Sequence, residues 1–344
     1  MLSTPGGSAS SPLVAHFAAA GDVSSPGAMQ LFGMLSSLLK VCSSGITAAG
    51  STAVAGSAAS PAAAAERMLA VGIAITARQP VSTVVGAAVC SMLMAALDKS
   101  SSSDQGESSS SSAGRSASTA ALPWLVLLGR CCAACAVLVQ YWQGSDESAA
   151  SGSLSSYRQP QQTVQEGVTL VNHLLLLQDG LAAVVQWLAA PDTAALGYQV
   201  QDMQQQLAEA AGGLSKGLAD LTGAAAASAH MTAEEKAAAA SAVYEGVQQQ
   251  LQAASSVLAC FAISHACNNP SCSNLCGPSE ARLVSGRTCN CSGCRTARYC
   301  GKVCQRAAWR QHKPVCKALA TAAAAAAESG VAEPAAESDG RVAK

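Results

Sequence analysis

The sequence has few aromatic residues, which make up 3% of its 344 residues, and few charged residues, which make up 12%. A core without large rings must be built from leucine, valine and alanine, so we expect helices that pack closely. The net charge of −1 excludes a protein that is basic overall. The first 25 residues lack a basic stretch followed by a leucine-rich run, and no arginine precedes Arg67. We therefore expect neither a secretory signal nor an organelle transit peptide.

Hydrophobic residues recur at helical spacing through most of 27–265. The pattern predicts helices over 27–42, 61–78, 81–97, 121–143, 161–190, 193–211 and 233–265, and residues 214–229 are alanine-rich. Thr232, followed by two glutamates, is typical of a helix N-cap with first-turn acids. No strict repeat is present. The sequence thus predicts a mostly α fold, an irregular α-helical array with solenoid-like packing as one form of it.

Polar, serine-rich segments divide this helical region. Residues 99–119 predict a flexible serine-rich linker, and 144–160 predict a second polar linker. We expect residues 1–26 to be disordered. The segment 318–344 is an alanine run followed by polar residues, so we expect it to extend a helix briefly and then become disordered.

Residues 121–143 are nearly all apolar and long enough to span a bilayer. Arg130 lies near the middle of this run, where a charge in lipid is costly. We therefore predict a buried core helix and no membrane partner. The nearby Cys131, Cys132 and Cys135 have no second pair or histidine beside them, so we expect buried thiols.

Nine of the fifteen cysteines lie between Cys267 and Cys316, together with His312. The spacings are Cys291-x2-Cys294, Cys300-x3-Cys304 and His312-x3-Cys316. A two-residue knuckle suits tetrahedral zinc, and the histidine has no role in a disulfide framework. Basic residues surround the cluster, and only Glu280 opposes them: Arg282, Arg287, Arg295, Arg298, Lys302, Arg306, Arg310, Lys313 and Lys317. Positive neighbours favour thiolates, so the segment predicts a zinc site.

This segment resembles the MYND-type zinc finger. The matching residues are Cys291-Ser-Gly-Cys294, Ala297-Arg298-Tyr299-Cys300, Cys304-Gln305, Trp309, His312-Lys313 and Cys316. The resemblance implies a small C-terminal finger, residues 266–317, with two interleaved zinc ions. The implied second site is Cys291, Cys294, His312 and Cys316. The implied first site combines Cys300 and Cys304 with an upstream cysteine pair.

The upstream pair departs from the family, which usually opens with Cys-x2-Cys. We favour Cys267 and Cys272, because the Asn-Asn-Pro-Ser between them is a turn sequence that can close a wider knuckle. Cys272 with Cys276 is the alternative. Cys289 is interpreted as a cysteine that does not bind zinc, because its neighbour Cys291 is a ligand in the tight knuckle.

The chemistry of such a finger is structural, since every zinc ligand comes from the protein. Residues 1–260 contain no glycine-rich cofactor loop or acid–base constellation, so we do not expect an enzyme. We expect a short helix over 303–312, ended by Pro314. The resemblance implies that Gln305 and Trp309 line a groove for proline-containing peptides, and that 296–298 pairs with the peptide backbone.

The sequence therefore predicts a zinc-binding adaptor that holds partner proteins through proline-containing peptides. One alternative is a basic finger that contacts nucleic acid, and another is a regulatory module of an enzyme complex. Cytoplasm and nucleus fit such a protein equally well.

Overall fold

The computed structural model describes residues 25–54, 83–98, 112–150, 160–191, 193, 199–227, 232–276, 279–286 and 289–328. The helix predicted over 61–78 lies outside these residues. So do residues 1–24 and 329–344, for which we predicted disorder.

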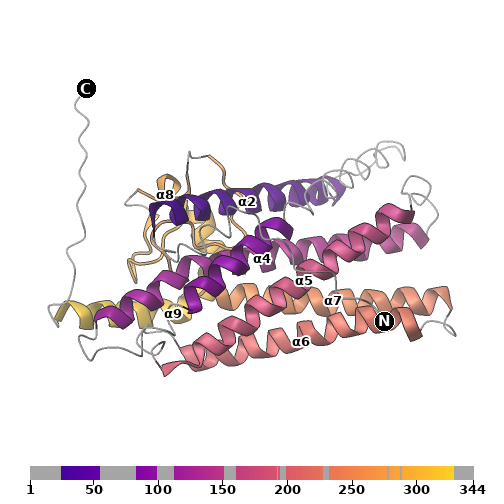
Figure 1. Cartoon of the computed structure of the whole chain (residues 1–344). Helices are drawn as coiled ribbons and strands as arrows, with labels where there is room; N and C mark the ends of the chain where they lie inside the picture. The colour runs from indigo at the N-terminus through magenta and orange to yellow at the C-terminus, as the bar shows by residue number, and fades with distance from the viewer. Residues whose placement is uncertain are drawn as a thin grey trace.

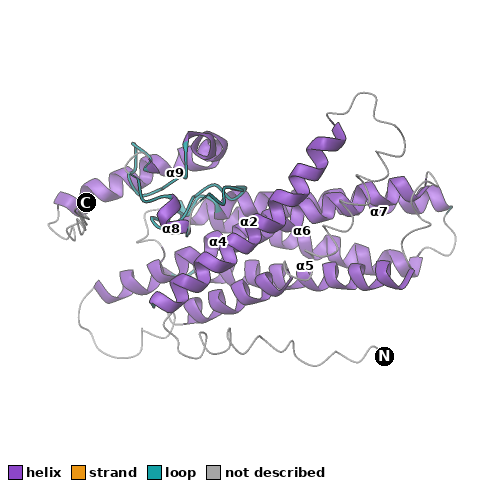
Figure 2. Cartoon of the chain, turned by 90° about the horizontal axis from the view of Figure 1, so that it is seen from above, coloured by secondary structure: helices purple, strands orange, loops and turns teal. Residues whose placement is uncertain are grey.

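The described part of the chain is helical, with one short bridge, Asn290 to Arg298, in place of strands. The elements are α2 (Pro26–Val54), the helix Thr83–Asp98, α4 (Ser112–Ala150), α5 (Pro160–Leu188), α6 (Val200–Ala227), α7 (Ala233–Leu258), α8 (Glu280–Leu283) and α9 (Lys302–Glu328). α5, α6 and α7 lie side by side, α2 crosses them obliquely in Figure 2, and the finger's loops gather with α8 and α9 at one end (Figures 1 and 2). The predicted fold class, a helical array followed by a small finger, is confirmed.

α4 is the central helix of the array, and it packs against α2, α5 and α7, while α6 packs against α5 and α7. Small residues allow close approach, as the composition predicts. A Cβ at Gly129 of α4 would lie 2.9 Å from the Cβ of Leu258 in α7, and one at Gly217 of α6 would lie 2.5 Å from Val247 Cγ2. A side chain at either position would therefore push two helices apart.

Among the residues that the structure describes, two helices are long and apolar enough to cross a membrane by length and composition alone. The more apolar of them, Ala120–Gln140 within α4, is 83% buried inside the protein, as a core helix would be. Arg130 in its middle is buried and lies 3.8 Å from the Glu280 carboxylate. Burial raises the pKa of Cys135 to about 12, which keeps this thiol protonated and inert, as predicted.

Several helix boundaries differ from the prediction. α4 begins at Ser112 and ends at Ala150, so it includes the ends of both predicted linkers. A helix that is already formed extends into polar neighbours at little cost, because only nucleation is unfavourable. The helix predicted over 193–211 does not end at residue 211, because α6 continues through the alanine-rich segment to Ala227. Its internal Gly213 provides room for α7, since a Cβ there would lie 2.6 Å from Gln250 Cδ.

α7 begins as predicted and ends early. Thr232 caps it through a capping box with Glu235, because each side chain bonds the backbone of the other residue. The predicted end at residue 265 is wrong, since α7 ends at Leu258. Beyond it, the side chain of Asn268 accepts from the Ile263 amide at 2.8 Å and donates to the Ile263 carbonyl at 2.8 Å. These two hydrogen bonds take the place of helical backbone hydrogen bonds, and the chain changes direction here and enters the finger.

Candidate metal centre

Four cysteine sulfurs meet in a first cluster, made by Cys267, Cys272, Cys300 and Cys304, with all donor atoms within 4.8 Å of one another. Cys300 Sγ lies 3.7 Å from Cys272 Sγ and 3.4 Å from Cys304 Sγ. These distances are too long for disulfides, in which the sulfurs are about 2.05 Å apart. A tetrahedral zinc with Zn–S bonds of about 2.3 Å separates its sulfurs by about 3.8 Å. The cluster therefore fits zinc.

The second cluster contains Cys291, Cys294, His312 and Cys316, all buried and also within 4.8 Å. Cys291 Sγ lies 3.7 Å from Cys316 Sγ. His312 Nε2 lies 3.3 Å from Cys291 Sγ and 3.5 Å from Cys294 Sγ. Burial lowers the pKa of His312, which favours the neutral imidazole that binds zinc. These distances also fit the edges of a zinc tetrahedron.

The wide knuckle of the first cluster is closed by its asparagines. The Cys272 amide donates to the Asn269 carbonyl at 3.1 Å, and the Ser271 amide donates to Asn269 Oδ1 at 3.2 Å. Asn268 fixes the knuckle against the strand-like segment before Cys300, since its amide and Nδ2 both donate to the Arg298 carbonyl at 2.8 and 2.9 Å. This turn places Cys267 and Cys272 on one side of the loop.

The tight knuckle of the second cluster depends on backbone geometry. The Arg295 amide donates to the Cys291 carbonyl at 2.9 Å, and Arg295 itself has a left-handed φ of 59°. The Ala297 amide donates to Cys294 Sγ at 3.5 Å, a bond that favours the thiolate. A Cβ at Gly293 would lie 2.7 Å from Cys316 Sγ. Cys316, the fourth ligand, can therefore approach the site only because residue 293 has no side chain.

α9 connects the two clusters, because it carries Cys304 of the first and His312 and Cys316 of the second. The predicted helix end at Pro314 is wrong, and α9 continues to Glu328. A proline inside a helix removes one backbone bond and costs about 3 kcal/mol. The buried side chains of Val315, Cys316 and Leu319 on the far side of the proline offset that cost.

Two cysteines of the segment stand apart from both clusters. Cys276 is exposed, and Cys289 points its Sγ toward the Leu283 carbonyl at 3.9 Å. The structure therefore brings Cys267 and Cys272 together with Cys300 and Cys304, and it leaves the alternative partner Cys276 outside.

The two residues expected to bind peptide lie one helical turn apart on α9. Trp309 is 42% exposed, and its ring centroid lies 6.1 Å from that of His312. Gln305 is half-buried. In the segment 296–298, the Arg298 carbonyl already accepts both bonds from Asn268, so this oxygen is not free for a peptide backbone.

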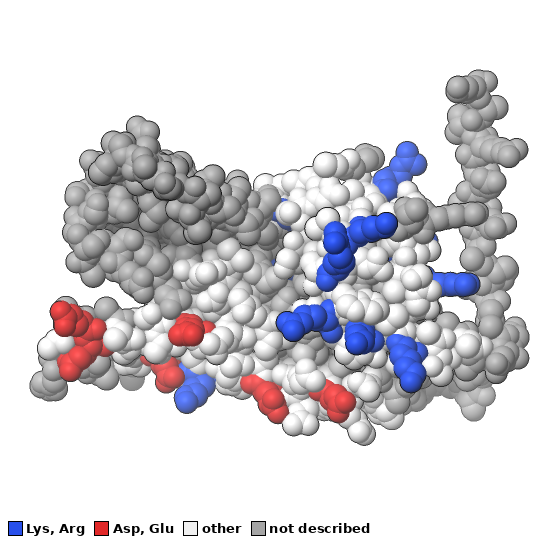
Figure 3. Space-filling view, turned by 180° about the vertical axis from the view of Figure 1, so that it is seen from behind, with Lys and Arg blue, Asp and Glu red and all other residues white. Residues whose placement is uncertain are grey.

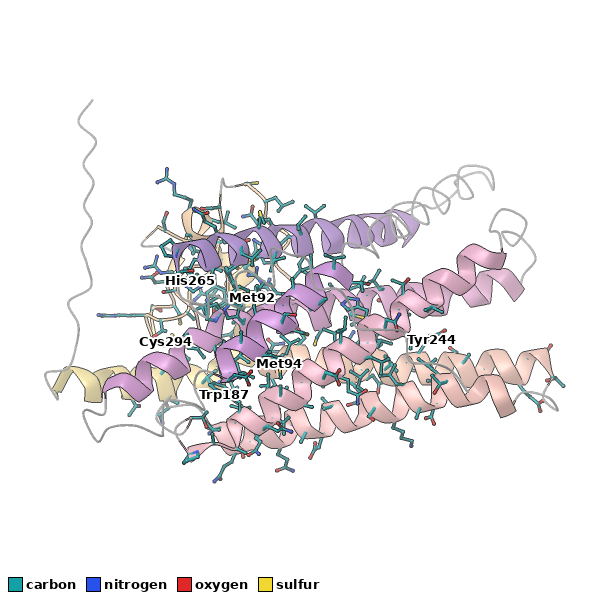
Figure 4. All side chains as sticks on the ribbon, in the orientation of Figure 1. Met92, Met94, Trp187, Tyr244, His265 and Cys294 are labelled. Carbon is teal, nitrogen blue, oxygen red and sulfur yellow. The ribbon has the colours of Figure 1, made fainter. Side chains whose placement is uncertain are left out.

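Helices far away in the chain reach the finger, a contact that the sequence pattern did not predict. Lys40 of α2 and Arg130 of α4 pair with Glu280 of α8, and all three are buried. His265 packs its ring edge-on against Phe32 of α2, with centroids 5.1 Å apart. Figure 4 shows His265 and Cys294 in the crowded end of the molecule where these elements meet. The sequence did contain an indication of this contact. Glu280 is the one acid in a basic segment and Arg130 is a charge in an apolar helix, and two such opposite charges stabilise each other when both are buried.

We expect the double substitution Cys267→Ser, Cys272→Ser to reduce bound zinc from two ions per chain to one, because serine is a poor zinc ligand and only the second cluster stays complete. Metal analysis of the purified, reduced protein measures this. The matched control is Cys276→Ser with Cys289→Ser, which should keep both ions. A loss of zinc in the control pair instead would show that the ligand assignment is wrong.

Comparison with known proteins agrees with this geometry. Residues 267–316 match the family model described as MYND finger. No curated protein and no solved structure was found to match the chain. Residues 267–316 thus form a MYND finger with two cysteine–histidine clusters suited to two zinc ions, and the helical region before them lies outside the matched segment.

Proposed function

We propose that this chain is an adaptor whose finger holds a proline-containing peptide of a partner protein against Trp309 and Gln305. The MYND finger is commonly a protein-interaction module. The observation that supports the proposal is the exposure of Trp309, 42% of which faces solvent although it is the largest side chain on α9. Aromatic surfaces of this kind suit polyproline segments, which are extended before they bind and lose little entropy.

The zinc ions have a structural part in this proposal. Each cluster offers four protein donors, which leaves no open position where water or a substrate could be activated. The Trp309 ring packs against His312, a member of the second cluster. The metal site therefore holds the binding surface rigid, and a rigid surface loses less entropy when a peptide docks.

Trp309→Ala should weaken binding of a proline-rich peptide by about 30-fold or more, because tryptophan anchors at interfaces contribute about 2 kcal/mol or more. Titration of a labelled peptide, followed by fluorescence anisotropy, measures the loss. Val303→Ala is the matched control, since Val303 is also an apolar residue of α9, is 74% exposed, and lies on another face. Equal affinities for the Trp309 variant and the unchanged protein would refute the groove.

A second candidate function, contact with nucleic acid, is favoured by the charge of the same surface. Seven basic residues of the finger are exposed: Arg282, Arg295, Lys302, Arg306, Arg310, Lys313 and Lys317. Among the described finger residues the one acid, Glu280, is buried and already paired, so it does not balance them. Figure 3 shows lysines and arginines gathered over one half of the visible face and acids over the other.

Salt distinguishes the two candidates. Binding through phosphates falls steeply as salt rises, with a slope of about −0.9 per phosphate contact in a plot of log K against log salt. Peptide binding that depends on Trp309 should change little over the same range. A steep slope that survives Trp309→Ala would favour nucleic acid over the peptide groove.

A further inference from the structure

The finger and the helical region share a buried group of charges. Lys40 of α2, Arg130 of α4 and Glu280 of α8 are each at most 4% exposed. Lys40 pairs directly with the Glu280 carboxylate, and Arg130 Nη1 lies 3.8 Å from it. We call these three residues the Lys40–Arg130–Glu280 cluster. Two cations face one carboxylate, so the cluster carries a buried positive charge that a further anion must balance.

Both cations also hold the backbone of the loop that carries the first zinc site. Arg130 Nη2 donates to the carbonyl of Cys267, and its Nη1 donates to Ser36 Oγ of α2. Lys40 Nζ donates to the Asn274 carbonyl, two residues after Cys272, at 2.9 Å. The helical region thus anchors this loop at both ends, at the first cysteine and just beyond the second.

A zinc ion bound by the four cysteines of the first site would supply the missing anion. Four thiolates outnumber the two positive charges of a zinc ion, so the complex is negative. Lys40 lies close to this site, because its Nζ donates to the carbonyl of Asn274, two residues after the ligand Cys272, at 2.9 Å. The first zinc site would therefore offset the positive charge of the Lys40–Arg130–Glu280 cluster, and the cluster would offset part of the negative charge of that site.

The second site has no charged anchor of this kind among the described residues; the helical region meets it through the Cys260 thiol, which donates to the carbonyl of Gln311, next to His312, at 3.4 Å. Its tight knuckle is fixed by its own amides, from Arg295 to Cys291 and from Ala297 to Cys294. The first knuckle is two residues wider than the family's usual one, and a longer loop leaves its two thiolates less restricted. The anchors from α2 and α4 compensate for that width.

We propose that Lys40 and Arg130 are positioning residues for the first zinc ion, so that retention of this ion depends on these two cations of the helical region while retention of the second does not. The proposal rests on zinc binding by the finger. Residues that support metal ligands from outside typically change metal affinity by about 10- to 100-fold. The finger and the helices consequently act as one unit, in which α2 and α4 complete a metal site that they do not ligate.

The experiment follows zinc transfer from the full-length, reduced protein to a chromogenic chelator at neutral pH. The Cys267→Ser, Cys272→Ser protein identifies the phase that belongs to the second site. We expect Lys40→Met to accelerate first-site release by about 10- to 100-fold and to leave the second phase unchanged. Lys40→Arg, which keeps the cation, should restore slow release. Lys216→Met, which removes an exposed lysine of α6, is the matched control.

Each outcome decides the proposal. Selective acceleration of the first phase, with helical circular dichroism unchanged, supports it. Equal acceleration of both phases, or none, overturns it. If Lys40→Met does not fold, Arg130→Lys provides the test, because it keeps the charge but shortens the reach to Cys267. Fewer than two zinc ions in the unchanged protein would point to failure of zinc binding itself.

Discussion

Removal of both zinc ions should unfold residues 267–316 and leave α5, α6 and α7 helical. The core of the finger consists largely of the ligands themselves: Cys267, Cys272, Cys291, Cys294 and Cys316 with Ala262, Val284, Ala297, Tyr299, Ala308 and Leu319. Few large apolar side chains remain when the metal leaves, and unscreened thiolates then repel one another. A structural zinc ion contributes about 10–16 kcal/mol to such a module, more than this core could replace.

Hydrogen exchange read by mass spectrometry measures this prediction. After treatment with a strong chelator, peptides from the finger should exchange within the shortest labelling time, while peptides from α6 and α7 stay protected. These helices keep their own core of residues such as Leu207, Leu214, Val247 and Leu251, all of which are buried. Unchanged protection in the finger after complete zinc removal would contradict the structural role of the metal.

Gly293→Ala should abolish the second zinc site and leave the first intact. The new Cβ would lie 2.7 Å from Cys316 Sγ, closer than real contacts allow. The sulfur cannot yield, because a zinc ligand must stay within about 0.2 Å of its bond length. The knuckle backbone would have to open instead, and Cys291 and Cys294 would lose the spacing that tetrahedral zinc requires.

Zinc content per chain measures this effect, with one ion expected instead of two. Gly301→Ala is the matched control, because a Cβ at that position meets nothing within 4 Å. Trp309 fluorescence offers a second measure, since the ring packs on His312 and should become more solvated when the second site opens. Two ions retained in Gly293→Ala would mean that Cys316 is not held where the structure places it.

Local spacing made the finger readable from sequence. The zinc ligands Cys291 and Cys294, and those from Cys300 to Cys316, lie close together in the sequence. Their spacing therefore indicates the geometry of the metal site without information about the rest of the chain. The wider knuckle was harder to assign, and the Asn-Asn-Pro-Ser turn favoured the pair that the structure brings together, Cys267 with Cys272.

Features that depend on contacts between residues distant in the sequence could not be predicted from local spacing. Pro314 suggests a helix end by local rules, and only the burial of Val315 and Leu319 explains why α9 continues through it. Gly212 and Gly213 are poor helix formers by local rules, yet α6 continues through them, and at Gly213 α7 comes so close that a Cβ would lie 2.6 Å from Gln250 Cδ. Lys40 and Glu280 are separated by most of the chain, so no sequence window includes both.

The segregation of charge has a consequence for how this protein approaches others. With a net charge of −1, the whole chain exerts almost no attraction or repulsion at long range. In the part of the chain that the structure describes, cations nevertheless gather at the finger and acids lie along α6 and α7, among them Asp202, Glu209 and Glu245, so that positive and negative charge are separated there. A molecule with separated charges turns its positive side toward an anionic surface before contact. At 0.1 M salt this attraction acts over a Debye length of about 10 Å. Encounters with such a surface should therefore occur finger first.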